Sequence, residues 1–470
     1  MSESINQVTK ISFTKLFLQA LRGDVKDFTT GSIDRAIFLL AVPMVLEMIL
    51  ESSFALVDIY FVNKVSPAAA ATVGLTESSL TILYSLAWGL AMGATALIAR
   101  RAGEKHFKEA SSIAVQAILI ATAFSVLISF FGILFPKEIL GFMGADAKMV
   151  DEHYRFTQLM LGGNVVIMLL FVNNGIFRGA GDASIAMKSL IISNIINIVL
   201  DPLLIMGYGP FPKMGLMGAA VATTIGRGCG VIFQFYHLFK GKDLIRLSIK
   251  QFRADLKLMK NLLNTSSGAM FQFLIGSCSW IFLTKIVAES GEESTSGYIT
   301  AIRICIFTLL PAWGIANAAA TLTGQNLGAG HPERAEKSVW RSAFLALCFF
   351  ISVGVIFFFF GEYLMRFFTS NEIAVREGTS CLHILALGYL FFAYGMVLTQ
   401  AFNGAGDTRT PTYINLFVFW CFQIPMAYLL AKFLKMGSMG VYLSICAAES
   451  VLAIVSIIIF KKGKWKLVKV

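Results

Sequence analysis

The sequence predicts an all-α polytopic membrane protein with twelve transmembrane helices in two pseudo-symmetric six-helix lobes. Composition and an internal duplication carry this prediction. Of the 470 residues, 56% are hydrophobic and only 14% are charged, whereas a soluble protein has roughly 25% charged residues. Apolar stretches of about 20 residues, the length of helix that crosses a bilayer, recur along the whole chain.

The duplication is visible as matching segments in the same order in both halves. They are 87–110 with 312–335, 177–182 (FRGAGD) with 402–407 (FNGAGD), and 213–218 (KMGLMG) with 435–440 (KMGSMG). The first two pairs have the same offset along the chain, and the offset of the third pair is slightly shorter. A membrane chain made of two similar halves is a common plan among secondary transporters. The repeated GAGD predicts a tight turn rather than a phosphate-binding loop.

Twelve candidate spans follow in order. They lie near 36–62, 76–99, 112–135, 154–177, 186–207, 216–238, 262–288, 297–322, 341–368, 380–402, 412–433 and 439–460. Six spans fall in each half, so both halves have the same orientation and are related by an axis along the membrane normal.

These spans divide the chain into five regions. Residues 1–32 are polar and charged, without the apolar core of a cleavable signal peptide, and we interpret them as a cytoplasmic leader. Residues 33–240 form the N-lobe, 241–261 a basic cytoplasmic linker, 262–462 the C-lobe and 463–470 a basic cytoplasmic tail.

The net charge of +11 is explained by its placement. Lys and Arg gather at the termini and in the even-numbered connections, whereas the opposite loops are acidic or mixed, as in 289–293 (ESGEE). The positive-inside rule then places both termini in the cytoplasm, and we expect a multi-pass protein of the plasma (inner) membrane. The basic excess indicates topology and contact with membrane lipids, and no nucleic-acid partner is expected.

Several classes of function are not supported by any motif. The seven cysteines all fall within predicted spans without paired spacing, so neither a disulfide framework nor a metal site is expected. The sequence has no GxxxxGK[ST] loop, no HExxH and no GxSxG. We therefore expect no enzyme activity and no cofactor. Uphill movement of a solute would have to be driven by an ion gradient.

Three carboxylates, Glu47, Glu51 and Asp58, lie in the first span. An ionisable group at the centre of a span costs roughly 2.5–3.5 kcal/mol on insertion scales, so each needs a partner or water. At 100° per residue their spacings place all three within about 40° of one helix face. We expect this face to attract cations or protons. An alternative is that Glu47 and Glu51 line a water-filled vestibule without binding an ion or a substrate. Pro43 marks a bend in the same span, either a hinge or a static kink.

Further polar residues in the fifth and sixth spans complete a candidate ion site. Asn197 and Asp201 share a helix face, and Thr223 lies in a small-residue stretch that permits close packing. With Asp58 they offer an oxygen cage for Na⁺, or a pair of carboxylates that share a proton. The second half has Leu283 in place of Asp58, so this acidic cluster belongs to the first half alone and a functional role is favoured.

One further pair of charges corresponds between the halves. Arg227 in the sixth span and Glu449 in the twelfth coincide when the halves are aligned at the offset of the third repeated segment. We predict that they form a structural charge pair across the pseudo-twofold axis. A gating role is the alternative.

The duplicated halves, FRGAGD and FNGAGDTRTP, GQNLGAG after the eighth span, and FALVD ending at Asp58 together resemble the MATE family of multidrug and toxic-compound extrusion transporters. The resemblance covers roughly residues 33–460. It implies two lobes arranged in a V, and export of organic, often cationic, compounds in exchange for Na⁺ or H⁺ by alternating access. The family's first-lobe cation site would map onto Asp58, Asn197, Asp201 and Thr223.

Gln272 stands near the place where several family members have an acid in the seventh span, so a second-lobe cation site is not expected. Together with Glu47 and Glu51, Gln272 is expected in the cavity that takes the substrate, a small organic cation, in a monomeric transporter. A flippase for lipid-linked oligosaccharides or other amphipathic metabolites is the main alternative, and it predicts a basic cavity. A channel is a further alternative that would not support uphill transport.

Overall fold

The computed structural model describes residues 12–24, 27–240 and 244–469. All regular secondary structure in these ranges is helical, and eleven helical spans in them are long and apolar enough to cross a membrane. The helix α2 (Ile33–Asn63), which carries the three carboxylates of the first predicted span, is not among the eleven. Its 31 residues nevertheless extend about 46 Å at 1.5 Å per residue, so α2 completes the expected set of twelve.

The first half folds into the N-lobe. Its spans are α2, α3 (Pro67–Gly103), α4 (Phe107–Leu134), α6 (Ala147–Gly162) continued by α7 (Val165–Gly179), α8 (Ala183–Met206) and α9 (Leu216–Lys240). The short helix α5 (Pro136–Phe142) precedes α6. The helix α1 (Phe13–Arg22) lies within the predicted leader and packs on α2 and α8. Residues 1–11 of that leader lie outside the described ranges.

The second half repeats this order in the C-lobe. Its spans are α10 (Leu256–Ala288), α11 (Glu292–Gly328), α12 (Pro332–Phe368), α13 (Glu372–Gly404), the composite α14–η2–α15–η3 (Arg409–Asn415, Leu416–Gln423, Ile424–Tyr428, Leu429–Phe433) and α16 (Ser438–Lys461). The segments η2 and η3 are π-helical. Two short 3₁₀ turns, η1 (Ile249–Gln251) and η4 (Lys464–Leu467), lie in the linker and the tail.

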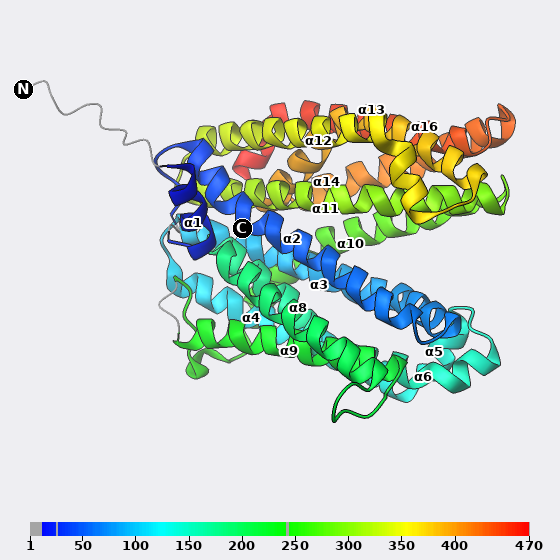
Figure 1. The fold of residues 1–470 in the computed structure, drawn as a ribbon. Coiled ribbons are helices and arrows are strands. Elements are labelled where there is room, and N and C mark those ends of the chain that lie inside the picture. The colour runs from blue at the N-terminus through cyan, green and yellow to red at the C-terminus, as the bar shows by residue number, and fades with distance from the viewer. Residues whose placement is uncertain (1–11, 25–26, 241–243, 470) are drawn as a thin grey trace, which may run out of the picture.

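The two lobes form a V (Figure 1). They converge at the end where α1 lies, and they diverge toward the end that carries α5 and α6. Each lobe has its own large apolar core. A smaller apolar cluster spans both lobes near α1 and joins side chains of α2 to side chains of α11.

The lobes contact each other reciprocally, as a pseudo-twofold axis requires. The first helix of each half packs on the second helix of the other, so that α2 contacts α11 and α10 contacts α3. A Cβ on Gly89 would lie 2.6 Å from the backbone nitrogen of Met270, and a Cβ on Gly314 would lie 2.6 Å from that of Val45. The two glycines correspond in the repeat, and so do their two partners, so the duplication preserves a close helix contact that only glycine permits.

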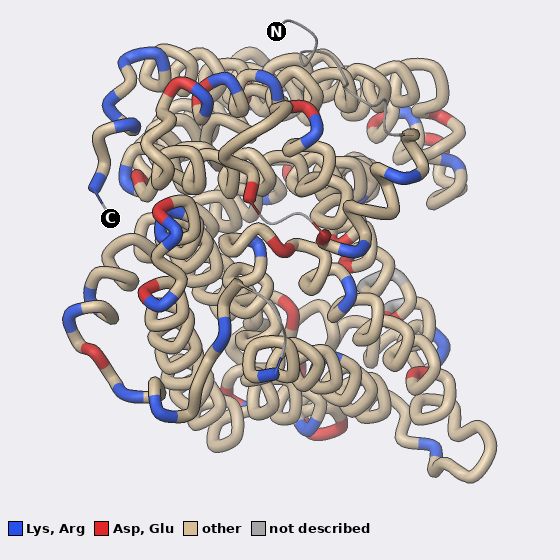
Figure 2. The backbone as a smooth tube through the Cα atoms, turned by 90° about the vertical axis from the view of Figure 1, so that its left-hand side faces the viewer, with Lys and Arg blue, Asp and Glu red and all other residues tan. Residues whose placement is uncertain are grey.

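Polar contacts tie the lobes together at the converging end. Arg334 of α12 donates to the backbone oxygens of Thr30 and Gly31 at 2.9 and 2.8 Å, and Arg341 pairs with Asp34 at 2.6 Å. Figure 2 looks onto this end and shows Lys and Arg along its loops and helix ends. The converging end is therefore the basic end that the sequence predicts.

The repeated GAGD motif forms a turn in both lobes, as predicted. Gly181 and Gly406 adopt the left-handed region at φ 84° and 88°. The backbone nitrogens of the following Asp182 and Asp407 donate to Phe177 and Phe402 at 2.8 and 3.0 Å. The glycine is needed because its missing Cβ makes this φ accessible at little cost.

Candidate functional site

The acidic face of α2 lies inside the N-lobe. Pro43 stands within the helix, which runs on through Glu47, Glu51 and Asp58 without a break. Glu47 is buried at 1% exposure, and the Glu51 side chain is 18% exposed. Glu47 has its own partners on α7, whereas Glu51 and Asp58 are both neighbours of Arg227 of α9.

Glu51 is the partner of Arg227. Its Oε1 lies 2.9 Å from a terminal nitrogen of the Arg227 guanidinium, which is 4% exposed. The guanidinium also lies 4.7 Å from the ring centre of Phe54 and 5.6 Å from that of Phe171, close enough for cation–π attraction.

The predicted pair of Arg227 and Glu449 is therefore wrong. Arg227 is neutralised by an acid of its own lobe, whereas Glu449 lines cavities in the C-lobe. Positions that correspond between two halves lie in equivalent places in the two lobes, and they meet only when those places are close to the axis.

The predicted ion-site residues of α8 and α9 are buried together. Asp201 and Asn197 have no exposed surface and Thr223 is 4% exposed. The Asn197 amide donates to Asp201 Oδ1 at 3.3 Å. A Cβ on Gly226 would lie 3.3 Å from the Asn197 Cβ, so α9 approaches α8 closely at this level. Thr223 lies one helical turn from Gly226, on the side of α9 that faces α8.

Asp58 of α2 lies within electrostatic reach of Asp201 and of Arg227. One oxygen each of Asp58, Asn197 and Asp201 is buried and has no hydrogen-bond partner among the described residues. Buried polar atoms normally have a partner, so these three oxygens are unsatisfied acceptors that lie in one region. No group of three or more His, Cys, Asp or Glu in the described residues could hold a metal ion.

Sequence reasoning missed Glu77 and Tyr84 of α3. Glu77 lies within electrostatic reach of Arg227, Asp58 and Glu51, and Tyr84 packs edge-to-face on Phe171 with ring centres 6.0 Å apart. Glu77 stands beside the predicted start of the second span, where a charge would be expected to face water. Glu77 is indeed exposed, and only its electrostatic interaction with residues of α2 and α9 links it to the acidic residues.

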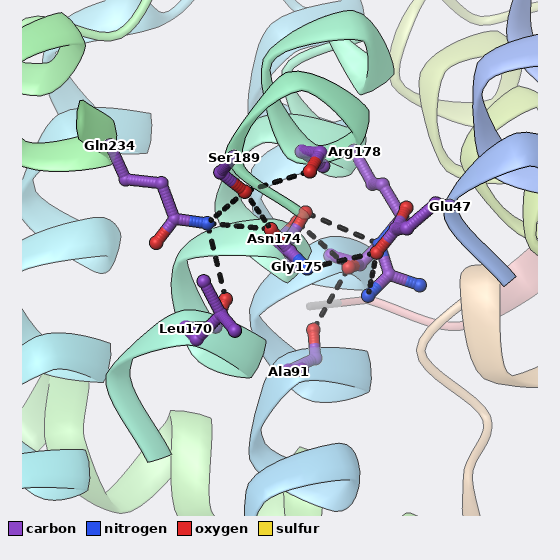
Figure 3. A network of polar contacts seen from close by, with 10 residues as sticks. Glu47, Ala91, Leu170, Asn174, Gly175, Arg178, Ser189 and Gln234 are labelled. Atoms are coloured by element: carbon purple, nitrogen blue, oxygen red, sulfur yellow. Dashed lines mark hydrogen bonds and ion pairs between the residues drawn. The ribbon is translucent and has the colours of Figure 1, made fainter. Parts of the chain in front are cut away.

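A second polar network surrounds Glu47, nearer the converging end (Figure 3). The Asn174 amide donates to Glu47 Oε1 at 2.9 Å, and Arg178 lies 3.5 Å from the same oxygen. Gln234 donates to Asn174 Oδ1 at 2.6 Å and to Ser189 Oγ at 3.0 Å. Sequence reasoning did not select these four partners. The adjacent Asn173 and Asn174 within an apolar span were the available signal.

The C-lobe has an uncharged version of this network. Gln272 and Asn403 correspond in the repeat to Glu47 and Arg178, and their amides donate to each other at 3.0 and 3.1 Å. Gln272 also donates to the backbone oxygen of Thr408 at 3.0 Å. An ion pair of the N-lobe is thus replaced by a hydrogen-bonded pair of neutral amides.

Gln272 also lines a cavity of about 320 Å³ in the C-lobe. Its wall includes Glu449, Gln423, several Trp and Phe rings, and Trp88 of the N-lobe. A smaller cavity of about 40 Å³ lies between the lobes and shares Trp88, Phe273 and Trp313 with the larger one. Gln272 therefore lies in a cavity wall as expected, whereas Glu47 and Glu51 are engaged by partners in the N-lobe.

Two same-sense six-helix lobes, with buried carboxylates in one and a roomy cavity in the other, define a membrane transporter rather than an enzyme. The MatE family model matches residues 43–203 and 269–429, one range in each half. The chain belongs to the MATE family of multidrug efflux transporters, whose members need no cofactor.

Individual relatives agree with this assignment. The chain is 27% identical over 432 residues to the probable multidrug resistance protein NorM of Thermotoga maritima, covering 91% of this chain and 92% of that protein. It is 25% identical to the FAD transporter of Shewanella oneidensis, over 85% of this chain and 88% of that protein. A crystal structure of a MATE protein in complex with MaL6 superposes with a TM-score of 0.87 at 26% identity, covering 96% of this chain and 99% of that chain.

Proposed function

We propose that this transporter is a secondary antiporter that exports organic cations in exchange for Na⁺ or H⁺, and that the coupling ion binds at Asp58, Asn197, Asp201 and Thr223. The observation that carries the proposal is the group of three buried oxygens without hydrogen-bond partners on Asp58, Asn197 and Asp201. An oxygen set with two carboxylates suits Na⁺, and the same two carboxylates can share a proton.

The direction of opening follows from the charges. The converging end carries the basic loops and the helix α1 near the start of the chain, so the positive-inside rule assigns it to the cytoplasm. The diverging lobes then face outward, and the protein lies in the plasma (inner) membrane as a monomer. Alternating access requires the lobes to close outside and open inside. Pro43 in α2 is the proposed hinge, because α2 runs past both lobes.

Binding of the coupling ion is proposed to act by neutralising buried charge. With the site empty, the carboxylates of Asp58 and Asp201 repel each other in a medium of low dielectric constant. A Na⁺ ion or a shared proton removes this repulsion and lets α2 and α8 approach. The ion and the exported cation would thereby favour different states of the N-lobe, which is the requirement for exchange.

An amphipathic-metabolite exporter is the second candidate, favoured by the similarity to a protein named FAD transporter. FAD carries phosphates and would need cationic groups in its cavity. In this chain the C-lobe cavity presents Glu449, and Arg227 is neutralised by Glu51. These charges favour a cation over an anion.

The test is efflux of ethidium from proteoliposomes that contain the purified protein, with a Na⁺ gradient and a proton gradient imposed separately. We expect one gradient to drive efflux and Asp58→Asn to abolish it. The control variant is Asp151→Asn, which makes the same change at a side chain that is 71% exposed. Full efflux by Asp58→Asn would refute the ion site. No ethidium movement under either gradient would refute the export of organic cations and favour the metabolite alternative.

A further inference from the structure

We propose that the C-lobe cavity binds an organic ammonium ion, with the carboxylate of Glu449 as its counter-ion and a set of aromatic rings as its wall. The proposal rests on the proposed export of organic cations and identifies the residue that recognises their charge. The predicted partner of Glu449, Arg227, is paired with Glu51 instead.

Glu449 is a buried acid without a partner. It lies on α16 with 6% of its surface exposed, and its Oε2 has no hydrogen-bond partner among the described residues. The side chain lines the 320 Å³ cavity and a second cavity of about 20 Å³ beside it. A carboxylate buried within a membrane span is costly unless a cation or a proton neutralises it.

The N-lobe has an ion pair at the positions that correspond to Glu449 and its surroundings. Arg227, which corresponds to Glu449, is neutralised there by Glu51 at 2.9 Å. In the second half, Gly276 corresponds to Glu51. Gly276 lines the large cavity, and a Cβ added to it would meet no atom within 4 Å. At these corresponding positions the N-lobe thus has an internal ion pair, whereas the C-lobe has the acid Glu449 beside open space. That space is where an external cation fits.

Neighbouring amides do not satisfy Glu449. Gln272 donates to Asn403 and Thr408, Gln423 is bonded to Ser279 through its oxygen at 3.0 Å, and Glu449 Oε2 receives no hydrogen bond from either amide. In the smaller cavity the other lining groups are mainly rings, hydrocarbon and thiols, including Phe392. A small inorganic cation needs a cage of several oxygens. The large cavity does offer unpartnered oxygens of Thr399 and Asn415, but most of its lining surface is apolar, which favours an organic ion that also gains from apolar contact.

The wall of the large cavity suits such an ion. Trp88, Phe273 and Trp313 contact one another, with ring centres 5.0–6.0 Å apart, and Trp280 and Phe392 also line the cavity. Aromatic faces attract ammonium groups, and cavities of about 300–1,000 Å³ are typical of sites for small organic ligands. Trp88 comes from the N-lobe, so movement of the lobes would change the wall and release the ion.

The test compares two flat tricyclic fluorophores, ethidium, which is permanently cationic, and riboflavin, which is uncharged. Binding of each to the purified full-length protein in detergent is followed by fluorescence. We expect Glu449→Gln to weaken ethidium binding about tenfold or more, since charge-assisted contacts in a desolvated site are strong. Riboflavin binding should be unchanged, because its ring system has no charge for Glu449 to recognise.

Two further variants make the test specific. Gly276→Lys places an ammonium group in the open space beside Glu449, by analogy with the Glu51–Arg227 pair, and should also abolish ethidium binding. Glu289→Gln removes an acid that is 51% exposed and pairs with Lys432, and it should leave binding of both fluorophores unchanged.

Several results would overturn the proposal. The first is that folded Glu449→Gln protein binds ethidium as well as the wild type does, and the second is that this variant loses ethidium and riboflavin binding equally. The third is that Na⁺ displaces ethidium from the wild type but not from the variant. The fourth is that the wild type does not bind ethidium. If Glu449→Gln does not fold, Gly276→Lys decides, and unchanged ethidium binding refutes the site. Charge-selective binding without gradient-driven efflux would refute the antiporter function while leaving the binding site established.

Discussion

The ion pair of Glu51 and Arg227 allows a quantitative prediction about stability. Both groups lie in a membrane span and make their closest charged contact with each other at 2.9 Å. Replacing Arg227 with Met keeps most of the side-chain volume but leaves the Glu51 carboxylate without its partner. Removing one member of a buried pair costs about 3–5 kcal/mol. Because the Glu51 side chain is 18% exposed, we expect the lower end of that range, about 3 kcal/mol.

The double variant is the informative one. Glu51→Met alone leaves the Arg227 guanidinium unpaired, and it should also cost about 3 kcal/mol. Glu51→Met combined with Arg227→Met removes both charges, and replacing a buried pair with apolar groups is often neutral or stabilising. The double variant should therefore be more stable than either single variant.

The assay is equilibrium unfolding of the purified protein in mixed micelles with an increasing fraction of sodium dodecyl sulfate, followed by circular dichroism. Arg366→Met is the control, since Arg366 is 44% exposed and pairs with Glu362 and Glu372 at the surface, where ion pairs contribute little. It should leave the free energy of unfolding nearly unchanged. Additive losses in the double variant would show that Glu51 and Arg227 do not depend on each other.

Three further outcomes follow from the described contacts. Gly89→Ala and Gly314→Ala each place a Cβ 2.6 Å from a backbone nitrogen of the opposite lobe, so each should lower the free energy of unfolding by about 1–3 kcal/mol, and by similar amounts. Asn174→Leu removes the amide that joins Glu47 to Gln234 and should cost about 1–3 kcal/mol in the same unfolding assay. Asp201→Asn should abolish gradient-driven ethidium efflux without changing the unfolding transition, and normal efflux would argue against its role.

The fold could be predicted from the sequence because its causes are local and repeated. Apolar length sets the spans, and the constant offset between the repeated segments sets the lobes. The grouping of Asn197 with Asp201 was also predictable, since both lie on one helix and helical periodicity fixes their relative direction. Partners on different helices were not predictable in this way. Arg178 beside Glu47 depends on the rotation and depth of α7 relative to α2, for which the sequence carries no local signal.

The failed prediction for Arg227 and Glu449 has a geometric cause. A twofold relation places corresponding residues at equal distances on opposite sides of the axis. Trp88 and Trp313 correspond in the same way and do meet, with ring centres 6.0 Å apart, because they lie where α3 and α11 approach each other. Correspondence predicts contact only for residues near the axis, and the sequence alone does not show which residues those are.

The two lobes keep the same backbone contacts but differ in charge. Gly89 and Gly314 occupy equivalent close contacts, because any side chain there would separate the helices, so packing constrains both copies alike. The buried polar positions are not constrained in this way. Glu47 with Arg178 becomes Gln272 with Asn403, a pair of neutral amides that needs no neutralising charge. Buried charge therefore persists where a ligand or an internal partner can balance it. By this reasoning the coupling ion should bind in the N-lobe at Asp58 and Asp201, and the organic cation in the C-lobe at Glu449, since each of these carboxylates has an oxygen without a partner among the described residues.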